Sequence, residues 1–226
     1  MEQKTKGLAK GVDEWIVRRS LEVLDRAFSR FERIGVAWST GKDSTVNLFL
    51  TRRFDRNIPV LFGDTGVHFE ETYQHRDRIA REWNLNLINM IPDVDYREVM
   101  GDRERCCHAL KTLPALKTLK ELGLDAIVVG VRWSEHQARA KEEYFSKREQ
   151  VYPHYRVHPI LHWTEEDVWN FTRGHNLPYN PLYSRGFRSI GCAPCTKPAP
   201  PDALERAGRA QDKEEIMDRL RALGYW

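Results

Sequence analysis

The chain has 226 residues, of which 41% are hydrophobic and 31% are charged, and its formal net charge is +3. This composition predicts a globular protein with a core, and the length allows one domain with an appendage. The small net charge neither requires nor excludes a nucleic-acid partner. The sequence has no apolar run of about 18 residues and no apolar N-terminal signal, so we expect a cytoplasmic protein that does not enter a membrane.

The first half of the chain alternates between strand and helix patterns. Residues 12–31 carry apolar side chains at helical spacing and predict an amphipathic helix. Strands are expected at 34–38, 59–62, 85–91 and 126–131, with helices at 44–53, 69–83 and 113–122 between them. This order is typical of βαβ units and predicts an α/β fold, doubly wound around a mostly parallel sheet.

The sequence pattern changes after Arg132. A charged stretch without a clear buried stripe is followed by a helix that Thr164 is expected to cap. A proline-rich loop region and a charged helical tail complete the chain. We therefore predict an N-terminal helix at residues 1–30, a nucleotide-binding α/β domain at 31–150 and a C-terminal region at 151–226.

The stretch VAWSTGKDSTVNLF (residues 36–49) places a tight polar turn between a strand and a helix. It differs from a Walker loop because Asp43 follows Lys42, where a Ser or Thr is required. Backbone N–H groups at the start of the helix still form a nest that favours a phosphate. The alternative is an ordinary N-cap turn, in which Ser and Asp are also common.

All four cysteines of the chain occur in two pairs, Cys106–Cys107 and Cys192-x-x-Cys195. Four thiolates suit a tetrahedral zinc ion or an iron–sulfur cluster. The adjacent pair differs from the C-x2–4-C spacing of zinc ribbons, and both of its side chains face one metal centre only if the backbone there is helical or kinked. A redox-active C-x-x-C disulfide and buried inert thiols remain as further alternatives.

Basic residues follow the fourth strand at Arg132, Arg139 and Lys141. One interpretation is that these residues form a solvated face. The other is a site for an anionic second substrate, because Arg132 follows the end of a strand at the same edge of the sheet as the polar turn. Asp64 follows the second strand. Its carboxylate is expected either to bind a ribose hydroxyl or a metal, or only to form a turn before glycine. No Ser/His/Asp spacing is readable, so nucleophilic hydrolase chemistry is not supported.

Five segments together resemble one family, the phosphoadenosine phosphosulfate (PAPS) and adenosine phosphosulfate (APS) reductases of the adenine nucleotide α-hydrolase-like, or PP-loop, superfamily. The segments are STGKDS (39–44), GDTGVHFEETYQHRD (63–77), RCCHALK (105–111), GVRWSEHQARAKEEYF (130–145) and PYNPLYSRGFRSIGCAPCTKP (178–198). The similarity covers roughly residues 30–200.

The resemblance implies a role for each matching residue. Phosphate binding is expected from Ser39, Thr40, Gly41, Lys42, Asp43 and Ser44. The nucleoside would lie beside Asp64, Thr65 and Gly66, and the anionic end of the substrate beside Arg132, Arg139 and Lys141. Catalysis would fall to Lys42, Asp43, Arg132 and Lys141, while a [4Fe–4S] cluster would be bound by Cys106, Cys107, Cys192 and Cys195, with Lys111 close to it.

One feature of the family is missing from this sequence. Reductases of the family attack the sulfate sulfur with a cysteine in a C-terminal ECGLH-like motif, whereas this chain has no cysteine after Cys195. The residues that follow resemble the end of the small, ATP-handling subunit of sulfate adenylyltransferase. The combination is similar to the ATP pyrophosphatase components of DNA phosphorothioation systems.

The sequence therefore predicts a PP-loop ATP pyrophosphatase that uses ATP and Mg²⁺ to activate a phosphate oxyanion. Its expected partners are a sulfur donor such as a cysteine desulfurase, DNA, and further copies or other subunits in a homo-oligomer or hetero-complex. Reduction of APS or PAPS is the alternative function. A non-catalytic iron–sulfur protein that binds nucleic acid or acts as a scaffold is the third.

Overall fold

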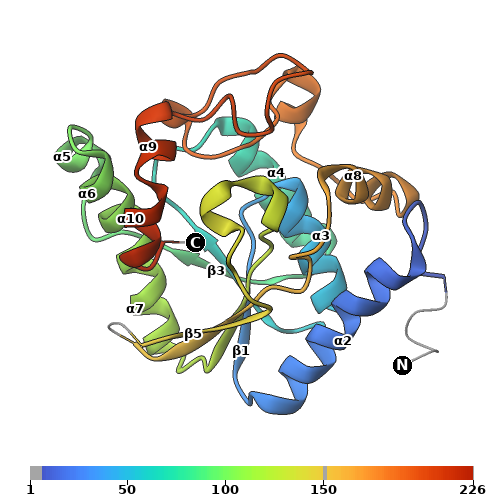
Figure 1. Cartoon of the computed structure of the whole chain (residues 1–226). Helices are drawn as coiled ribbons and strands as arrows, with labels where there is room; N and C mark the ends of the chain where they lie inside the picture. Colours follow the sequence, from blue (N-terminus) through green and yellow to red (C-terminus); the bar gives the residue numbers. More distant parts are fainter. Residues whose placement is uncertain (1–6, 150–151, 226) are drawn as a thin grey trace.

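The computed structural model describes residues 7–149 and 152–225, which are built around one six-stranded sheet (Figure 1). The strand order is β3-β2-β1-β4-β6-β5, and β5 alone pairs antiparallel with its neighbour. The strands are β1 (Ile34–Ala37), β2 (Pro59–Gly63), β3 (Asn86–Met90), β4 (Ala126–Val128), β5 (Phe145–Arg148) and β6 (His154–Val157). The predicted α/β fold with a mostly parallel sheet is confirmed.

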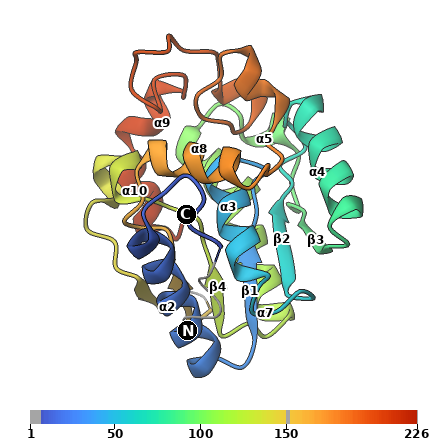
Figure 2. The same ribbon diagram turned by 90° about the vertical axis from the view of Figure 1, so that its right-hand side faces the viewer.

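Helices connect the strands and cover both faces of the sheet (Figures 1 and 2). The longer helices are α2 (Glu14–Arg30), α3 (Lys42–Thr51), α4 (Glu70–Glu82), α7 (Leu113–Glu121) and α8 (Glu165–Gly174). Shorter ones are α5 (Tyr96–Val99), α6 (Arg103–Cys107), α9 (Gln211–Glu215) and α10 (Met217–Ala222). Single turns are η1 (His108–Thr112), η2 (Trp133–Glu135), η3 (Gln137–Arg139), η4 (Pro181–Arg185) and η5 (Ala193–Cys195).

Two apolar cores lie on opposite faces of the sheet. Val36, Val60 and Val128 belong to the core that packs against α2, α3 and α8, whereas Leu61 and Ile127 belong to the core beneath α7. Side chains of a strand alternate between its two faces, so each central strand contributes to both cores. This is why the central strands read as nearly continuous apolar runs.

The sequence did not indicate the hairpin formed by β5 and β6. Lys147 and Arg148 of β5 are polar residues of an edge strand, and β6 buries His154 and Arg156 among its four residues. Arg156 Nη1 donates to the carbonyl of Tyr225 at 3.1 Å, so tertiary partners make up for its burial. The predicted boundary at residue 150 falls between these two paired strands of one sheet.

The loops at the carboxyl ends of β1, β2 and β4 meet at one edge of the sheet, as expected for ligand sites of open α/β folds. Gly130, which follows β4, allows close approach to α3. A Cβ atom at this glycine would lie 3.0 Å from the carbonyl oxygen of Asp43 and 3.1 Å from Ser44 Cα. None of the described helices is long and apolar enough to span a membrane.

Candidate functional site

The loop between β1 and α3 is tied to the first turn of the helix that follows it. The backbone N–H of Ser39 donates to Ser44 Oγ at 3.1 Å, and this hydroxyl donates to the carbonyl of Gly41 at 3.0 Å. The first N–H groups of a helix have no partner within the helix and favour an anion. The loop therefore has the form expected of a phosphate site.

Thr40 holds an unfavourable backbone conformation within this loop. Its φ angle is 62°, a left-handed value that β-branched residues rarely adopt. Asn180 Nδ2 donates to Thr40 Oγ1 at 3.3 Å and to Thr72 Oγ1 at 3.2 Å. The backbone N–H of Lys42 donates to Tyr183 Oη at 2.9 Å. The C-terminal region thus holds the loop in place through side-chain hydrogen bonds.

Lys42 and Arg132 are buried cations that share two carboxylates. Lys42 Nζ donates to Asp43 Oδ2 at 3.1 Å and also to Glu205 Oε1. Arg132 Nε donates to Asp43 Oδ1 at 2.5 Å, and its Nη2 donates to the two oxygens of Glu205 at 2.6 and 2.7 Å. Lys42 is 2% exposed and Arg132 is 0% exposed. Because buried charges require partners, these four residues form one coupled network.

The network shifts the pKa values of its members in different directions. Burial alone would lower the pKa of Lys42 and raise that of Asp43, but their ion pairs outweigh burial, so the pKa of Lys42 is raised and that of Asp43 is lowered. Burial, and then the nearby charge of Asp43, raise the pKa of Glu205 against the opposing effect of the two cations. Glu205 is therefore the member whose charged form is least favoured.

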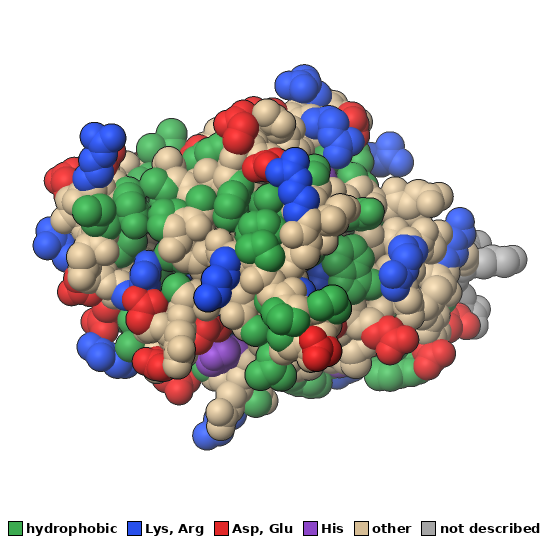
Figure 3. All heavy atoms as spheres, turned by 90° about the horizontal axis from the view of Figure 1, so that it is seen from above, with side chains coloured by type: hydrophobic (Ala, Val, Ile, Leu, Met, Phe, Trp, Pro, Cys, Tyr) green, Lys and Arg blue, Asp and Glu red, His purple; other side chains and the backbone are tan. Residues whose placement is uncertain are grey.

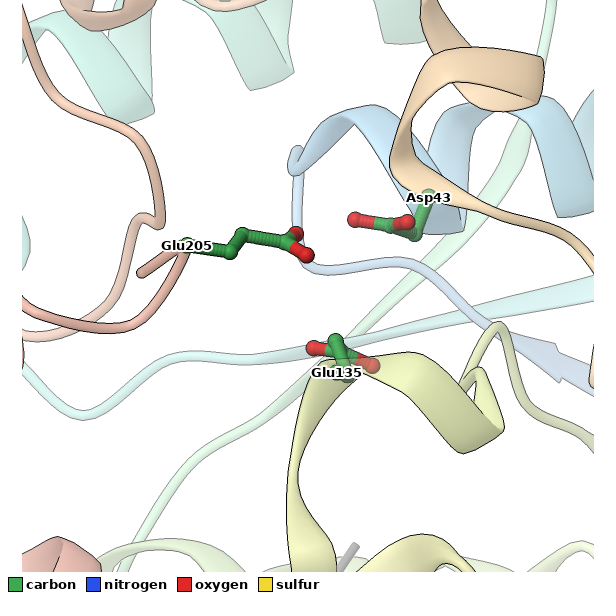
Figure 4. A group of neighbouring side chains, drawn as sticks. All are labelled: Asp43, Glu135 and Glu205. Carbon is green, nitrogen blue, oxygen red and sulfur yellow. The ribbon is translucent and has the colours of Figure 1, made fainter. Parts of the chain in front are cut away.

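Three carboxylates converge at this point, one each from Asp43, Glu135 and Glu205 (Figure 4). They offer oxygens within 4.8 Å of one another, an arrangement that a Mg²⁺ ion favours. Each carboxylate is already paired with a cation, however, since Arg139 and Arg206 contact Glu135 while Lys42 and Arg132 contact the other two. In this arrangement the carboxylates do not fit a Mg²⁺ ion.

A cavity lies beside the network, between the Ser39–Ser44 loop, the ends of β2 and β4, and the C-terminal residues. One part of its wall is apolar and includes Phe62, Met90 and Val131. The basic residues that line it are Lys42, Lys111, Arg139, Arg206 and Arg209, and the acidic ones are Asp43 and Glu135. The cavity thus combines an apolar surface with an excess of positive charge, which suits an anion attached to an aromatic base.

The four cysteines line a second, smaller cavity. Cys106 and Cys107 end α6 directly before the π-helical turn η1, a rare conformation that is frequent at functional sites. Cys192 and Cys195 lie on either side of the short turn η5. All four are buried free thiols. The structure thus brings the two pairs together, and helical backbone allows the adjacent pair to face one centre.

Polar groups surround the thiols. Arg103 Nη1 donates to Cys195 Sγ at 2.8 Å, and Thr65 Oγ1 lies 3.4 Å from Cys192 Sγ. Burial, with the neighbouring thiols, raises the pKa of Cys106 to about 11. A bound cation would relieve this mutual repulsion of thiolates. The four donors therefore fit a thiolate-bound metal centre.

Lys111 and Arg209 line both cavities and so lie between the two. Burial would raise the pKa of Cys192, but the charges of Lys111, Lys213 and Arg209 together with the hydrogen bond to Thr65 outweigh it and lower this pKa to about 7. Tyr225 closes the same region, with its ring 5.8 Å from Lys111 Nζ and its Oη accepting from Lys213 Nζ at 2.6 Å. A ligand in the first cavity would therefore lie next to the cysteines, with Lys111 between them.

Comparison with known families gives an independent result. The chain matches the family described as "Phosphoadenosine phosphosulfate reductase domain" over residues 33–198. It is also 33% identical over 201 residues to adenosine 5'-phosphosulfate reductase 1 of Bacillus subtilis, which covers 84% of this chain and 85% of the relative. The chain belongs to the phosphoadenosine phosphosulfate reductase family.

Solved structures support the fold of this PAPS reductase family member. A PAPS reductase from Candida auris, in a phosphate complex, superposes with a TM-score of 0.66 at 23% identity, covering 79% of this chain and 90% of that one. The FMN adenylyltransferase of Candida glabrata, in complex with FMN and an ATP analogue, superposes with a TM-score of 0.69 at 22% identity. The match covers 83% of this chain and 66% of that one. At these identities the likeness concerns the fold alone.

Only some of the predicted site residues of this PAPS reductase family member line the first cavity. Arg139 lines the first cavity, whereas Lys141 is exposed on the following turn. The carboxylate of Asp64 accepts hydrogen bonds from Tyr73 Oη at 2.9 Å and from the backbone N–H of Gly66 at 3.1 Å. The hydroxyl of Thr65 faces Cys192, as described above. The nucleoside-binding role of residues 64–66 stays a prediction.

Sequence reasoning missed the residues that the C-terminal region brings to the site. Glu205 and Arg206 reach the ion network, Arg209 lies between the two cavities, and Tyr183 accepts from the loop. The sequence pattern places residues 205–209 (ERAGR) in the predicted helical tail, whereas the structure has turns there and the first helix of the tail begins at Gln211. A turn brings Glu205 and Arg206 to the site, which a helical pattern does not indicate.

Proposed function

We propose that this chain acts on an adenosine phosphosulfate in sulfur metabolism and binds a [4Fe–4S] cluster on Cys106, Cys107, Cys192 and Cys195. The observation that carries the proposal is the adjacency of the two cavities, which lie on either side of Lys111 and Arg209. The name and 33% identity of the Bacillus subtilis relative support APS as the sulfonucleotide. A cluster, when bound, would stabilise four neighbouring thiolates and hold the end of the cavity together.

Each part of the cavity has a role in binding such a substrate. The apolar wall accommodates the adenine ring, and the loop N–H groups with Lys42 bind the phosphosulfate, with the buried Arg132 of the adjoining ion network behind Lys42. When the bond between sulfur and the bridging oxygen breaks, AMP leaves with the additional negative charge. Preorganised cations at that position stabilise the charge as it develops.

The reductive step requires a thiol that these residues do not provide. A thiolate attacks the sulfate sulfur, the bond from sulfur to the AMP oxygen breaks, and a thiosulfonate forms. A second thiol then releases sulfite and leaves a disulfide. The four cysteines of the sequence all line the second cavity. We therefore assign the attacking thiol to a donor outside these 226 residues.

The commitment of all four cysteines to one cavity favours a second candidate, an ATP pyrophosphatase. In this reaction an oxyanion attacks the α-phosphate of ATP and forms an adenylylated intermediate, and pyrophosphate leaves towards Lys42. A DNA backbone phosphate as acceptor, with a cysteine desulfurase as sulfur donor in a hetero-complex, would make it a phosphorothioation component. Acidic and basic side chains alternate on the face seen in Figure 3, which does not favour DNA there.

A product assay separates the two candidates. Iron-loaded protein with APS and a dithiol donor is expected to release sulfite and AMP in equal amounts, and the rate should depend on the donor concentration because all four thiols of the chain would be bound to the cluster. The same protein with ATP and Mg²⁺ is expected to form little pyrophosphate. Pyrophosphate release without sulfite formation would instead establish the second candidate. A protein that produces neither would be a binding or scaffold protein.

A further inference from the structure

Glu205 occupies the position that the proposed function assigns to the anion of the substrate. Its carboxylate accepts hydrogen bonds from the two buried cations, with Arg132 Nη2 at 2.6 and 2.7 Å from its oxygens and Lys42 Nζ on Oε1. The side chain is 10% exposed. A carboxylate held by an arginine and a lysine is bound as a sulfate or phosphate oxygen pair would be.

The segment that carries Glu205 is a loop closed at its base. The backbone N–H of Lys197 donates to the carbonyl of Gly208 at 2.8 Å, and Thr196 and Arg209 form an isolated antiparallel β-bridge. At the tip, Leu204 is 84% exposed directly before the partly buried Glu205. The middle of the loop is held by the backbone N–H of Ala199, which donates to the carbonyl of Gly186 at 3.1 Å, and by Arg188 Nη1, which donates to the carbonyls of Pro201 and Ala203. None of these partners belongs to a strand, so the loop can move without disturbing the sheet. We call this segment the Lys197–Gly208 loop.

Glu205 and a bound oxyanion cannot share the two cations. The oxygens of Asp43, Glu135 and Glu205 already lie within 4.8 Å of one another. A further negative charge beside them would repel all three carboxylates in surroundings that screen charge less than water does. Burial and Asp43 also raise the pKa of Glu205, which shows that its charge is already disfavoured. Glu205 is thus the carboxylate that an incoming anion displaces most readily.

We propose that the carboxylate of Glu205 is an internal competitor for the anion of the substrate, and that the Lys197–Gly208 loop opens when the anion binds. This proposal rests on the proposed function, because it takes Lys42 and Arg132 as the anion-binding residues. The proposal adds a defined state of the protein without ligand, in which the side chain of Glu205 occupies the anion site. A loop that is closed 90–99% of the time lowers the apparent affinity for an anion by about 10–100-fold.

The test measures the binding of inorganic pyrophosphate to the full chain by calorimetry. Glu205→Gln removes the competing charge at nearly constant size, and we expect it to bind pyrophosphate about 10–100-fold more tightly than the wild type. Asp202→Asn is the matched control, because Asp202 is an exposed carboxylate of the same loop, and it should leave the affinity unchanged. Equal or weaker binding by Glu205→Gln would show that Glu205 positions the cations and would overturn the proposal.

A second measurement on the wild type does not depend on the folding of any variant. Pyrophosphate is expected to speed hydrogen exchange of the amides in residues 198–207 if the loop opens, whereas slower exchange would contradict opening. A different result would make Glu205 a metal ligand and overturn the proposal. In that case the wild type would bind Mg²⁺ alone, and Glu205→Gln would lose this binding while its pyrophosphate affinity stays unchanged. Neither readout requires turnover, so the competitor role can stand or fall independently of APS chemistry.

Discussion

Lys42→Ala is expected to lower turnover of the nucleotide substrate by about 10²–10³-fold, the usual cost of removing one preorganised donor that stabilises developing charge. Lys42 is suited to this role because its ammonium group is fixed at the start of α3 and stays charged, since the ion pairs raise its pKa. Without it, the negative charge of the leaving group is stabilised by Arg132 and the loop N–H groups alone. Steady-state kinetics with APS and with ATP measures the loss.

Lys141→Ala provides the control for this experiment. The sequence offered Lys141 as a catalytic residue, but its side chain is exposed and lies outside the lining of the first cavity. We expect its activity to stay within about twofold of the wild type, as for a surface change of about 0.5 kcal/mol or less. Equal losses in the two variants would show that charge in general, and not the position of Lys42, determines the rate. Circular dichroism should confirm that both variants are folded.

Replacement of any one of the four cysteines by serine is expected to remove most of the iron from anaerobically purified protein. The wild type should contain about four irons per chain, as four thiolate ligands suggest. The large effect follows from the geometry, because all four thiols are buried around one cavity and each would contribute one ligand. Iron analysis and the absorption spectrum of each variant provide the measurement.

Thr65→Val is the matched control for the cysteine variants. Its hydroxyl lies 3.4 Å from Cys192 Sγ, so its removal changes the surroundings of the thiol without removing a ligand. Iron content close to that of the wild type is expected, with at most a small spectral change. Stoichiometric zinc without iron in the wild type would contradict the cluster. Full iron content in a Cys192→Ser variant would contradict the ligand set.

The central sheet could be predicted from the sequence because its strands obey simple patterns. β1, β2 and β4 are buried on both faces and read as short apolar runs, and the helices between them have helical periodicity. The hairpin of β5 and β6 could not be predicted in this way. Arg156 is buried in β6 because the C-terminal carbonyls of Gly224 and Tyr225 accept its hydrogen bonds, and these partners lie almost 70 residues away.

The site was predictable as far as local motifs extend. The turn at residues 39–44 and the two cysteine pairs are sequence-local signals, and the structure places each at the edge of the sheet or around one cavity. Glu205 and Arg206 reach the network from a loop that is more than 70 residues distant from Arg132 in sequence. Only the folded chain reveals that they pair with Arg132 and Glu135.

We propose that the first cavity binds an adenine nucleotide by its anionic end at Lys42, with Arg132 in the ion network behind it. Calorimetric titration of the iron-loaded protein with APS and with AMP tests it most directly, because the two ligands differ only in the sulfate. Charge-assisted hydrogen bonds contribute about 1.5–3 kcal/mol each, so we predict that APS binds at least about tenfold more tightly than AMP, and that Lys42→Ala reduces this difference about tenfold or more. Equal affinity for APS and AMP, or no binding of either, would contradict the account.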